Sequence, residues 1–274
     1  MKNKVFNIVA NNTDIYGQIH SPKEPRAVVV LVHGMGEHSG RYAEKVVPFL
    51  LSQELAVVSY DNFGHGQSGG KRGHCPSYGA LMELLDDVVQ MARKEFTSIP
   101  VLLYGHSMGG NLVLNYLLDH NPNIKAAIVT SPYLRLGFQP PKWKMILGKV
   151  MLKLVPSITL PSGLDSSGIS RIPSEIEKYI ADPLIHDKVS PMFSFPIMEA
   201  GERAISKAYL LKVDTLLLHG TADPIIDYHA TEEFHRNATK TTFCPIEGGF
   251  HELHHDLGSE DFFATIKKWL AEKV

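Results

Sequence analysis

Short, almost uninterrupted runs of apolar and β-branched residues recur along the chain, at 27–32, 55–60, 101–104, 126–130 and 215–219. Runs without polar alternation are typical of strands that are buried on both faces, as in a parallel sheet. Stretches of helical period separate them at about 42–53, 79–96 and 109–120, and a last one at about 259–272 begins with a serine followed by acidic residues. This alternation predicts βα units around a mostly parallel central sheet.

The stretch from 132 to 212 breaks this rhythm and is rich in proline. We therefore predict a core formed by 1–131 and 213–274, with a lid or cap inserted at 132–212. Within the insertion, apolar side chains recur at helical spacing beside four lysines: Trp143, Ile146, Leu147, Val150, Met151 and Leu154, next to Lys142, Lys144, Lys149 and Lys153. Two interpretations are open. The helix packs its apolar face on the core, or it faces lipid with its lysines at the interface.

Composition limits the class of protein. The chain has 274 residues, of which 44% are hydrophobic and 20% charged, so it can bury a large core and extensive disorder is excluded. A net charge of −2 argues against an electrostatic nucleic-acid binder. Cys75 and Cys244 stand far apart without a CxxC motif, which excludes a disulfide framework. No secretion signal and no run of about 18 apolar residues is found, so we expect a cytoplasmic protein and leave peripheral membrane association open.

One motif stands at the junction between an expected strand and an expected helix. Gly105-His106-Ser107-Met108-Gly109-Gly110 follows the run 101–104 and precedes the helix 109–120. A serine on such a turn forms a nucleophile elbow, whose strained backbone requires small neighbours. We predict Ser107 as the nucleophile and the Met108 N–H as an oxyanion-hole donor. The alternative is a glycine-flanked turn with a structural role only.

A serine nucleophile needs a base and an acid that orients the base. In enzymes with this elbow the acid follows the serine, and the histidine follows the acid. Asp223 comes just after the strand 215–219, at the edge of a parallel sheet where ligands gather. Asp214 precedes that strand and so lies at the wrong edge, and Asp227 fits a helix N-cap better. We predict Asp223 as the acid.

The base is expected near residue 251. His251 follows Gly248-Gly249, which would allow it to fold back over the site, and His254 and His255 are nearby alternatives. We predict His251 as the base. The second oxyanion-hole donor is expected in the glycine-rich loop after the strand 27–32, as the N–H of Met35.

The chain resembles the α/β-hydrolases and, more closely, the monoacylglycerol lipases. The resemblance covers nearly the whole chain and is carried by four blocks: residues 33–42 (HGMGEHSGRY), residues 64–68 (GHGQS), the elbow 105–110, and 164–167 (LDSS) with 182–184 (DPL). It implies acyl transfer through an acyl-serine intermediate without a cofactor or metal. It also implies contacts to the glycerol head from Glu37, Arg41 and His254, and from a lid tyrosine at Tyr179. The alternatives are a surface ion pair between Glu37 and Arg41, and a solvated His254.

Three other motifs are weighed and rejected. Residues 66–70 repeat the Gly-x-Ser-x-Gly pattern around Ser68, but they follow a polar turn and lead into no helix. Residues 64–69 match the dinucleotide fingerprint but lack the helix that it requires. Residues 251–255 read His-Glu-x-x-His, as in zinc proteases, but Gly248-Gly249 would break the helix on which such a site is built.

We therefore expect a serine lipase or esterase that hydrolyses monoacylglycerols to fatty acid and glycerol. The expected partner is a small lipid ester, with transient contact to a membrane or micelle through the lid, and the oligomeric state is left open. The alternatives are a lysophospholipase or general carboxylesterase of the same fold, a peptidase, and a non-catalytic lipid-binding protein.

Overall fold

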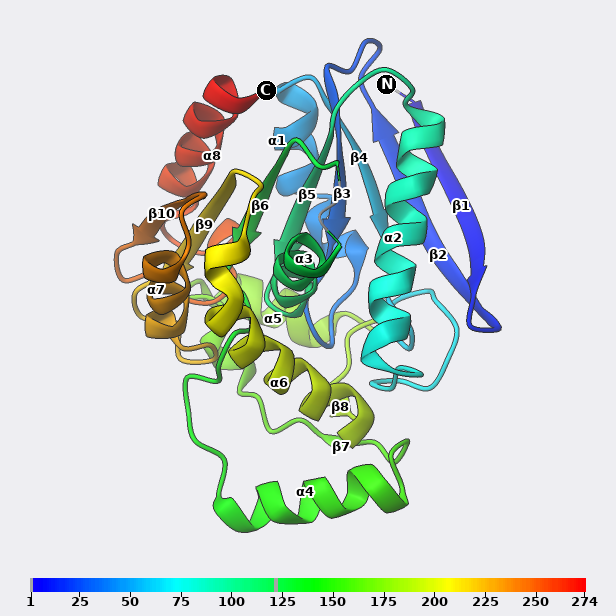
Figure 1. Ribbon diagram of the computed structural model, residues 1–274, viewed down its shortest axis with the longest axis vertical. Coiled ribbons are helices and arrows are strands. Elements are labelled where there is room, and N and C mark those ends of the chain that lie inside the picture. Colours follow the sequence, from blue (N-terminus) through cyan, green and yellow to red (C-terminus); the bar gives the residue numbers. More distant parts are fainter. Residues whose placement is uncertain (1, 121–122) are drawn as a thin grey trace.

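A computed structural model describes residues 2–120 and 123–274 of the chain (Figure 1). Its centre is an eight-stranded sheet in the order β1-β2-β4-β3-β5-β6-β9-β10, in which β1 pairs antiparallel with β2, β2 antiparallel with β4, and every later pair is parallel. The strands are β1 (Lys2–Ala10), β2 (Thr13–Ser21), β3 (Ala27–Val32), β4 (Leu55–Tyr60), β5 (Val101–His106), β6 (Ala126–Thr130), β9 (Thr215–Gly220) and β10 (Thr241–Ile246). The five strands predicted from apolar runs are confirmed.

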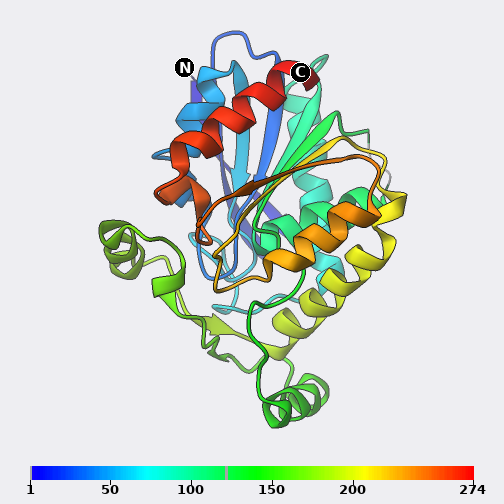
Figure 2. The same cartoon turned by 90° about the vertical axis from the view of Figure 1, so that its left-hand side faces the viewer.

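Helices cover both faces of the sheet, and each face has its own hydrophobic core (Figure 2). The helices α1 (Val46–Ser52) and α8 (Ser259–Lys273) bury aliphatic and aromatic side chains against one face. The opposite face is covered by α2 (Tyr78–Glu95), α3 (Met108–Asp119), α6 (Pro191–Lys207) and α7 (Tyr228–Asn237). Short 3-10 turns complete the chain at Ser39–Tyr42, Ser166–Gly168, Ala208–Leu210 and Leu253–His255. The predicted α/β class, with a mostly parallel sheet between helices, is confirmed.

The segment between β6 and β9 leaves the sheet at its carboxyl edge and returns through α6. It contains α4 (Lys142–Leu154), α5 (Pro173–Ala181) and a two-stranded ribbon of β7 (Leu160–Pro161) and β8 (Lys188–Val189). The helix α6 then packs along α3, where the side-chain amide of Asn111 donates to Ile197 O at 3.0 Å and that of Asn115 donates to Ala200 O at 3.2 Å. Therefore the part of the insertion that stands away from the sheet consists of α4, α5 and the ribbon.

The helix α4 lies farthest from the sheet, at the end of the molecule opposite both termini (Figures 1 and 2). None of its described residues is buried, and Trp143, Ile146 and Leu154 are 63%, 66% and 75% exposed. The helix contacts α6, where Gly148 lies against Phe195, but the face that holds these three side chains is not packed on the core. Within residues 2–120 and 123–274, no helix combines the length and the apolar character needed to cross a bilayer.

Candidate active site

Ser107 occupies the tight turn between β5 and α3. Its backbone angles are φ 53° and ψ −115°, a conformation that costs energy for a residue with a side chain. The turn leaves no room for a side chain at the positions two residues before and two residues after Ser107. A Cβ at Gly105 would lie 2.5 Å from Gly109 O, and a Cβ at Gly109 would overlap Val32 O. The glycines therefore let α3 begin directly against β3 and β5, with the Ser107 hydroxyl at the carboxyl edge of the sheet.

The structure brings Ser107, His251 and Asp223 into one hydrogen-bonded chain. His251 Nε2 lies 2.9 Å from Ser107 Oγ, and His251 Nδ1 lies 2.7 Å from Asp223 Oδ2. Asp223 follows β9 and His251 follows β10, so neighbouring parallel strands deliver both side chains to the edge where Ser107 stands. This is the geometry that a serine nucleophile, its general base and an orienting acid require.

The surroundings of His251 favour its protonated form. Burial disfavours the charged form of Asp223, but the charge of His251 and the hydrogen bonds from His219 and His251 outweigh it, so the pKa of Asp223 lies well below its usual range. Burial also opposes a charge on His251, yet Asp223 raises the pKa of this histidine above its ordinary value. His106, whose ring lies beside that of His251, stays neutral because burial and the neighbouring His251 lower its pKa to about 3.

The loop after β3 lies beside the serine. A Cβ at Gly34 would lie 3.2 Å from Ser107 Cβ, and Met35 is half-buried and lines the same cavity as Ser107. The insertion also contacts this loop, because His186 N–H donates to Gly36 O at 2.9 Å. The two predicted oxyanion-hole donors, the N–H groups of Met35 and Met108, are thus on the two segments that flank Ser107, and their role stays a prediction.

Of the residues expected at the glycerol head, Glu37, Arg41 and His254 are buried and Tyr179 is half-buried. Arg41 Nε lies 3.6 Å from Glu37 Oε2, and the Arg41 guanidinium lies 4.9 Å from the centre of the Tyr179 ring. Glu37 and Tyr179 line the cavity, whereas Arg41 and His254 lie behind its wall. His254 is fully buried and stacks on Tyr42. The alternatives of a surface ion pair and a solvated His254 are therefore wrong.

Glu252 lies at this site, although the sequence indicates it only as part of the rejected zinc motif. It lines the cavity, accepts from Arg41 Nη2 at 2.5 Å and lies 2.8 Å from His255 Nδ1. Burial alone would raise its pKa, but His255 and Arg41 outweigh burial and hold the pKa of Glu252 at about 2. The signal that could have revealed it is its position next to the base, because a residue beside His251 must share the same edge of the sheet.

The rejected motifs have structural roles. The Ser68 hydroxyl accepts the Tyr16 N–H at 2.9 Å and donates to Asp61 O at 2.6 Å, so it ties the loop after β4 to β2. The His-Glu-x-x-His stretch contains only a three-residue 3-10 turn in place of the α-helix of zinc proteases. Side-chain ligand atoms of Glu252, His254 and His255 lie within 4.8 Å of one another, but Arg41 also contacts this cluster, and its charge opposes a bound cation.

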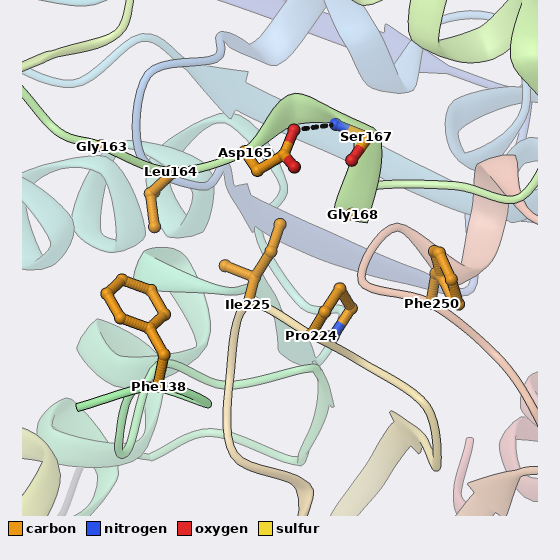
Figure 3. A pocket seen from close by; sticks show the side chains of 9 residues that line it. All are labelled: Phe138, Gly163, Leu164, Asp165, Ser167, Gly168, Pro224, Ile225 and Phe250. Atoms are coloured by element: carbon orange, nitrogen blue, oxygen red, sulfur yellow. Dashed lines mark hydrogen bonds between the residues drawn. The ribbon is translucent and has the colours of Figure 1, made fainter. Parts of the chain in front are cut away.

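A cavity of about 870 Å³ extends from Ser107 beneath the insertion. Its wall is mainly apolar and includes Tyr133, Trp143, Leu147, Met151, Phe195, Met198 and Ile226. The carboxylates of Glu37 and Glu252 lie near the serine end, since both act electrostatically on His251. A side recess of about 370 Å³ adjoins the cavity and shares part of its wall with it, including Phe138, Leu164 and Ile225 (Figure 3). In Figure 3 the Asp165 carboxylate is turned back to accept the Ser167 N–H, at 2.9 Å.

Comparison with known proteins gives consistent matches over most of the chain. The family model described as "Serine aminopeptidase, S33" matches residues 23–258. Human monoglyceride lipase is 30% identical over 257 residues, which cover 91% of this chain and 84% of the human protein. An uncharacterized abhydrolase domain-containing protein of Dictyostelium discoideum is 33% identical over all of this chain, which spans only 30% of the length of that relative. The crystal structure of Paleococcus ferrophilus monoacylglycerol lipase superposes with a TM-score of 0.87 at 32% identity, covering 95% of this chain and 99% of the other.

Proposed function

The chain belongs to the S33 serine hydrolase family and within it to the monoglyceride lipases, and on this premise we propose that it hydrolyses monoacylglycerols to a fatty acid and glycerol. It is a carboxylic ester hydrolase of the α/β-hydrolase fold. The observation that carries the proposal is the chain of hydrogen bonds from Asp223 through His251 to Ser107, at one end of a mainly apolar cavity.

In the proposed mechanism Ser107 Oγ attacks the ester carbonyl while His251 Nε2 takes its proton. Asp223 holds His251 in the tautomer with the proton on Nδ1 and stabilises the imidazolium. The N–H groups of Met35 and Met108 donate to the oxyanion of the tetrahedral intermediate. When this intermediate collapses, His251 gives its proton to the leaving glycerol oxygen. A water molecule, activated by the same histidine, then hydrolyses the acyl-serine and releases the fatty acid.

The cavity supports a substrate with one acyl chain and a small polar head. Its volume lies within the range of about 300–1,000 Å³ that is usual for small-molecule sites, and most of the side chains that α4 contributes to its wall are apolar. Burying a long acyl chain there gains about 0.8 kcal/mol for each methylene group. At the serine end, the carboxylates of Glu37 and Glu252 are acceptors for glycerol hydroxyls, and Arg41 behind them offsets their charge.

The proposal includes contact of α4 with a lipid surface. The helix presents Trp143, Ile146 and Leu154 to solvent, and the four lysines of α4 flank this stripe. Large apolar side chains beside lysines are typical of helices that lie in a membrane interface. Since α4 also contributes Leu147 and Met151 to the cavity wall, a lipid substrate could pass from the surface to the cavity along one helix.

The test compares four substrates: monooleoylglycerol, lysophosphatidylcholine, a short-chain nitrophenyl ester and an aminoacyl nitroanilide. We expect the highest kcat/KM for monooleoylglycerol. Activity that favours lysophosphatidylcholine, the short ester or the anilide would replace the proposal with a lysophospholipase, a general esterase or an aminopeptidase. Ser107→Ala is the control, and labelling of Ser107 by a fluorophosphonate distinguishes all of these enzymes from a non-catalytic lipid-binding protein.

A further inference from the structure

Asp223, the acid of the proposed triad, is contacted by a second histidine. His219 is the penultimate residue of β9 and precedes Asp223 by four positions. Its Nε2 is 3.0 Å from Asp223 Oδ2, the same atom that His251 contacts. The other carboxylate oxygen, Oδ1, accepts the backbone N–H groups of Ile225 and Ile226 at 2.8 and 3.0 Å. Four donors therefore surround this carboxylate, and two of them are imidazole rings.

The protonation of His219 follows from its partners. An ionised carboxylate can only accept hydrogen bonds, so the His219 proton that faces Asp223 must be on Nε2. Nδ1 then accepts the hydroxyl proton of Thr231, whose Oγ1 lies 2.7 Å away on α7. Both His219 and Thr231 are fully buried, so water cannot take the place of either partner. The result is a continuous chain from Thr231 through His219 and Asp223 to His251 and Ser107.

We propose that His219 is a positioning residue for the proposed triad: its Nε2–H occupies one lone pair of Asp223 Oδ2 and so fixes the direction in which His251 must approach. Because the carboxylate also shares its negative charge with His219, less of that charge acts on His251. His219 therefore limits how basic His251 becomes and keeps it unprotonated, and able to accept the Ser107 proton, at lower pH. This inference rests on the function proposed above.

The groups that face this histidine pair are few and can be named. His219 faces Asp223 and, edge-on from α7, the Tyr228 ring, whose centre is 5.8 Å away. His251 faces Asp223 and His106, and the carboxylates of Glu252 and Glu37 act on it from farther away. Of these groups, only Asp223 contacts both histidines by hydrogen bonds, so removal of the His219 donor must act on His251 through Asp223.

The experiment follows the rate of Ser107 labelling by a fluorophosphonate between about pH 5 and 9, the range in which a histidine base titrates. This readout depends on the basicity of His251 and not on the natural substrate. His219→Leu removes the donor at similar volume, whereas His219→Gln retains an N–H donor and an acceptor for Thr231. His235→Leu is the matched control, because His235 makes the same contact to a threonine, with its Nδ1 2.7 Å from Thr241 Oγ1, outside the site.

We expect the midpoint of the acid limb to rise by about half a pH unit in His219→Leu, since Asp223 then acts on His251 alone. His219→Gln should return the midpoint to that of the parent protein, and His235→Leu should leave it unchanged. A folded His219→Leu protein that keeps the parent midpoint, even at a lower plateau rate, would overturn the inference and leave His219 a structural role.

If His219→Leu does not fold, Thr231→Val tests the same chain from its far end. It removes the hydroxyl that donates to His219 Nδ1 and thereby strengthens the Nε2–H donor to Asp223, so a smaller rise of the midpoint is expected, and an unchanged midpoint overturns the inference. The proposed function fails separately: labelling that persists in Ser107→Ala would reject Ser107 as the nucleophile, whatever the His219 variants show.

Discussion

The Glu37 carboxylate accepts the backbone N–H of Gly34 at 2.6 Å, three residues back along the same loop. The same oxygen accepts the Tyr42 hydroxyl, also at 2.6 Å. Gly34 lies against Ser107 and directly precedes Met35, whose N–H is proposed to bind the oxyanion. Glu37 therefore holds the conformation of the loop to which it belongs, and its second carboxylate oxygen is left for contact with substrate.

We predict that Glu37→Ala lowers kcat on a short nitrophenyl ester by about 10- to 100-fold, somewhat less than the loss of an oxyanion-hole donor itself. This ester has no glycerol head, so a residue that only binds the head would not affect its hydrolysis. Glu37→Gln keeps an oxygen that can accept from Gly34 and Tyr42, and it should retain most of the activity. Equal rates for the parent protein and Glu37→Ala would show that Glu37 does not hold the loop.

Replacement of Gly109 by a residue with a side chain should lower the stability of the protein. A Cβ there would overlap Val32 O and lie 2.8 Å from His33 O, so α3 must move away from β3. Overpacking of this kind costs about 1–3 kcal/mol or more, and we expect Gly109→Ala to lower Tm by about 2–10 °C. Thermal unfolding followed by circular dichroism measures this loss.

Gly79→Ala is the matched control for Gly109→Ala. Gly79 is also helical, in the first turn of α2, and the nearest atom to a Cβ at this position, Ser77 Oγ, would be 3.6 Å away. Alanine is favoured over glycine in a helix by about 0.5–1 kcal/mol, so Tm should stay constant or rise. If both variants unfolded at the same temperature, the close approach of α3 to β3 would not be the reason for glycine at 109.

Sequence patterns predicted the centre of this fold better than its edges. The strands β3, β4, β5, β6 and β9 are buried on both faces and therefore appear as uninterrupted apolar runs. In β2, buried and partly exposed positions alternate, and β1 forms the edge of the sheet, so neither produces such a run. The prolines of the predicted insertion concealed α6, a 17-residue helix with Pro196 inside it.

The proposed triad could be located from residue order and local motifs, whereas its surroundings could not. Ser107, Asp223 and His251 each follow a strand, so a strand assignment places them at one edge. His219, Glu252 and the burial of His254 depend on which side chains of separate strands meet, and that information is in the packing of β9, β10 and the Ser39–Tyr42 turn. In the sequence alone, Arg41 has the character of a surface residue. Its burial depends on the ion pairs with Glu37 and Glu252, which only the structure reveals.

The raised pKa of His251 predicts the pH dependence of activity. The unprotonated ring is the base, so kcat/KM should rise with pH through a value above the ordinary histidine pKa of about 6.5 and then level off. Asp223→Asn removes the charge that raises this pKa, so the midpoint of the acid limb should move to lower pH. Because the variant also disturbs the tautomer of His251, kcat should fall by about 10⁴-fold. An acid limb well below pH 6 in the parent protein would contradict the assigned network.

The exposed face of α4 predicts reversible binding to lipid vesicles. Ile146 and Leu154 are mostly exposed and do not line the cavity, so their replacement by serine tests the surface alone. Each aliphatic side chain that enters the interface contributes about 1.5–3 kcal/mol at most, and losing two should weaken binding by tenfold or more. Sedimentation with vesicles of phosphatidylcholine and phosphatidylserine measures this affinity.

The matched control for Ile146→Ser/Leu154→Ser is Val5→Ser/Val9→Ser, which removes two exposed aliphatic side chains from the edge strand β1. If α4 is the lipid-facing element, only the first pair weakens vesicle binding, and raising the salt concentration weakens binding of the parent because the lysines of α4 attract anionic headgroups. Both pairs should hydrolyse a soluble nitrophenyl ester at the parent rate. Equal vesicle binding by the two double variants would remove α4 from the interface, while the assignment of Ser107, His251 and Asp223 would be unaffected.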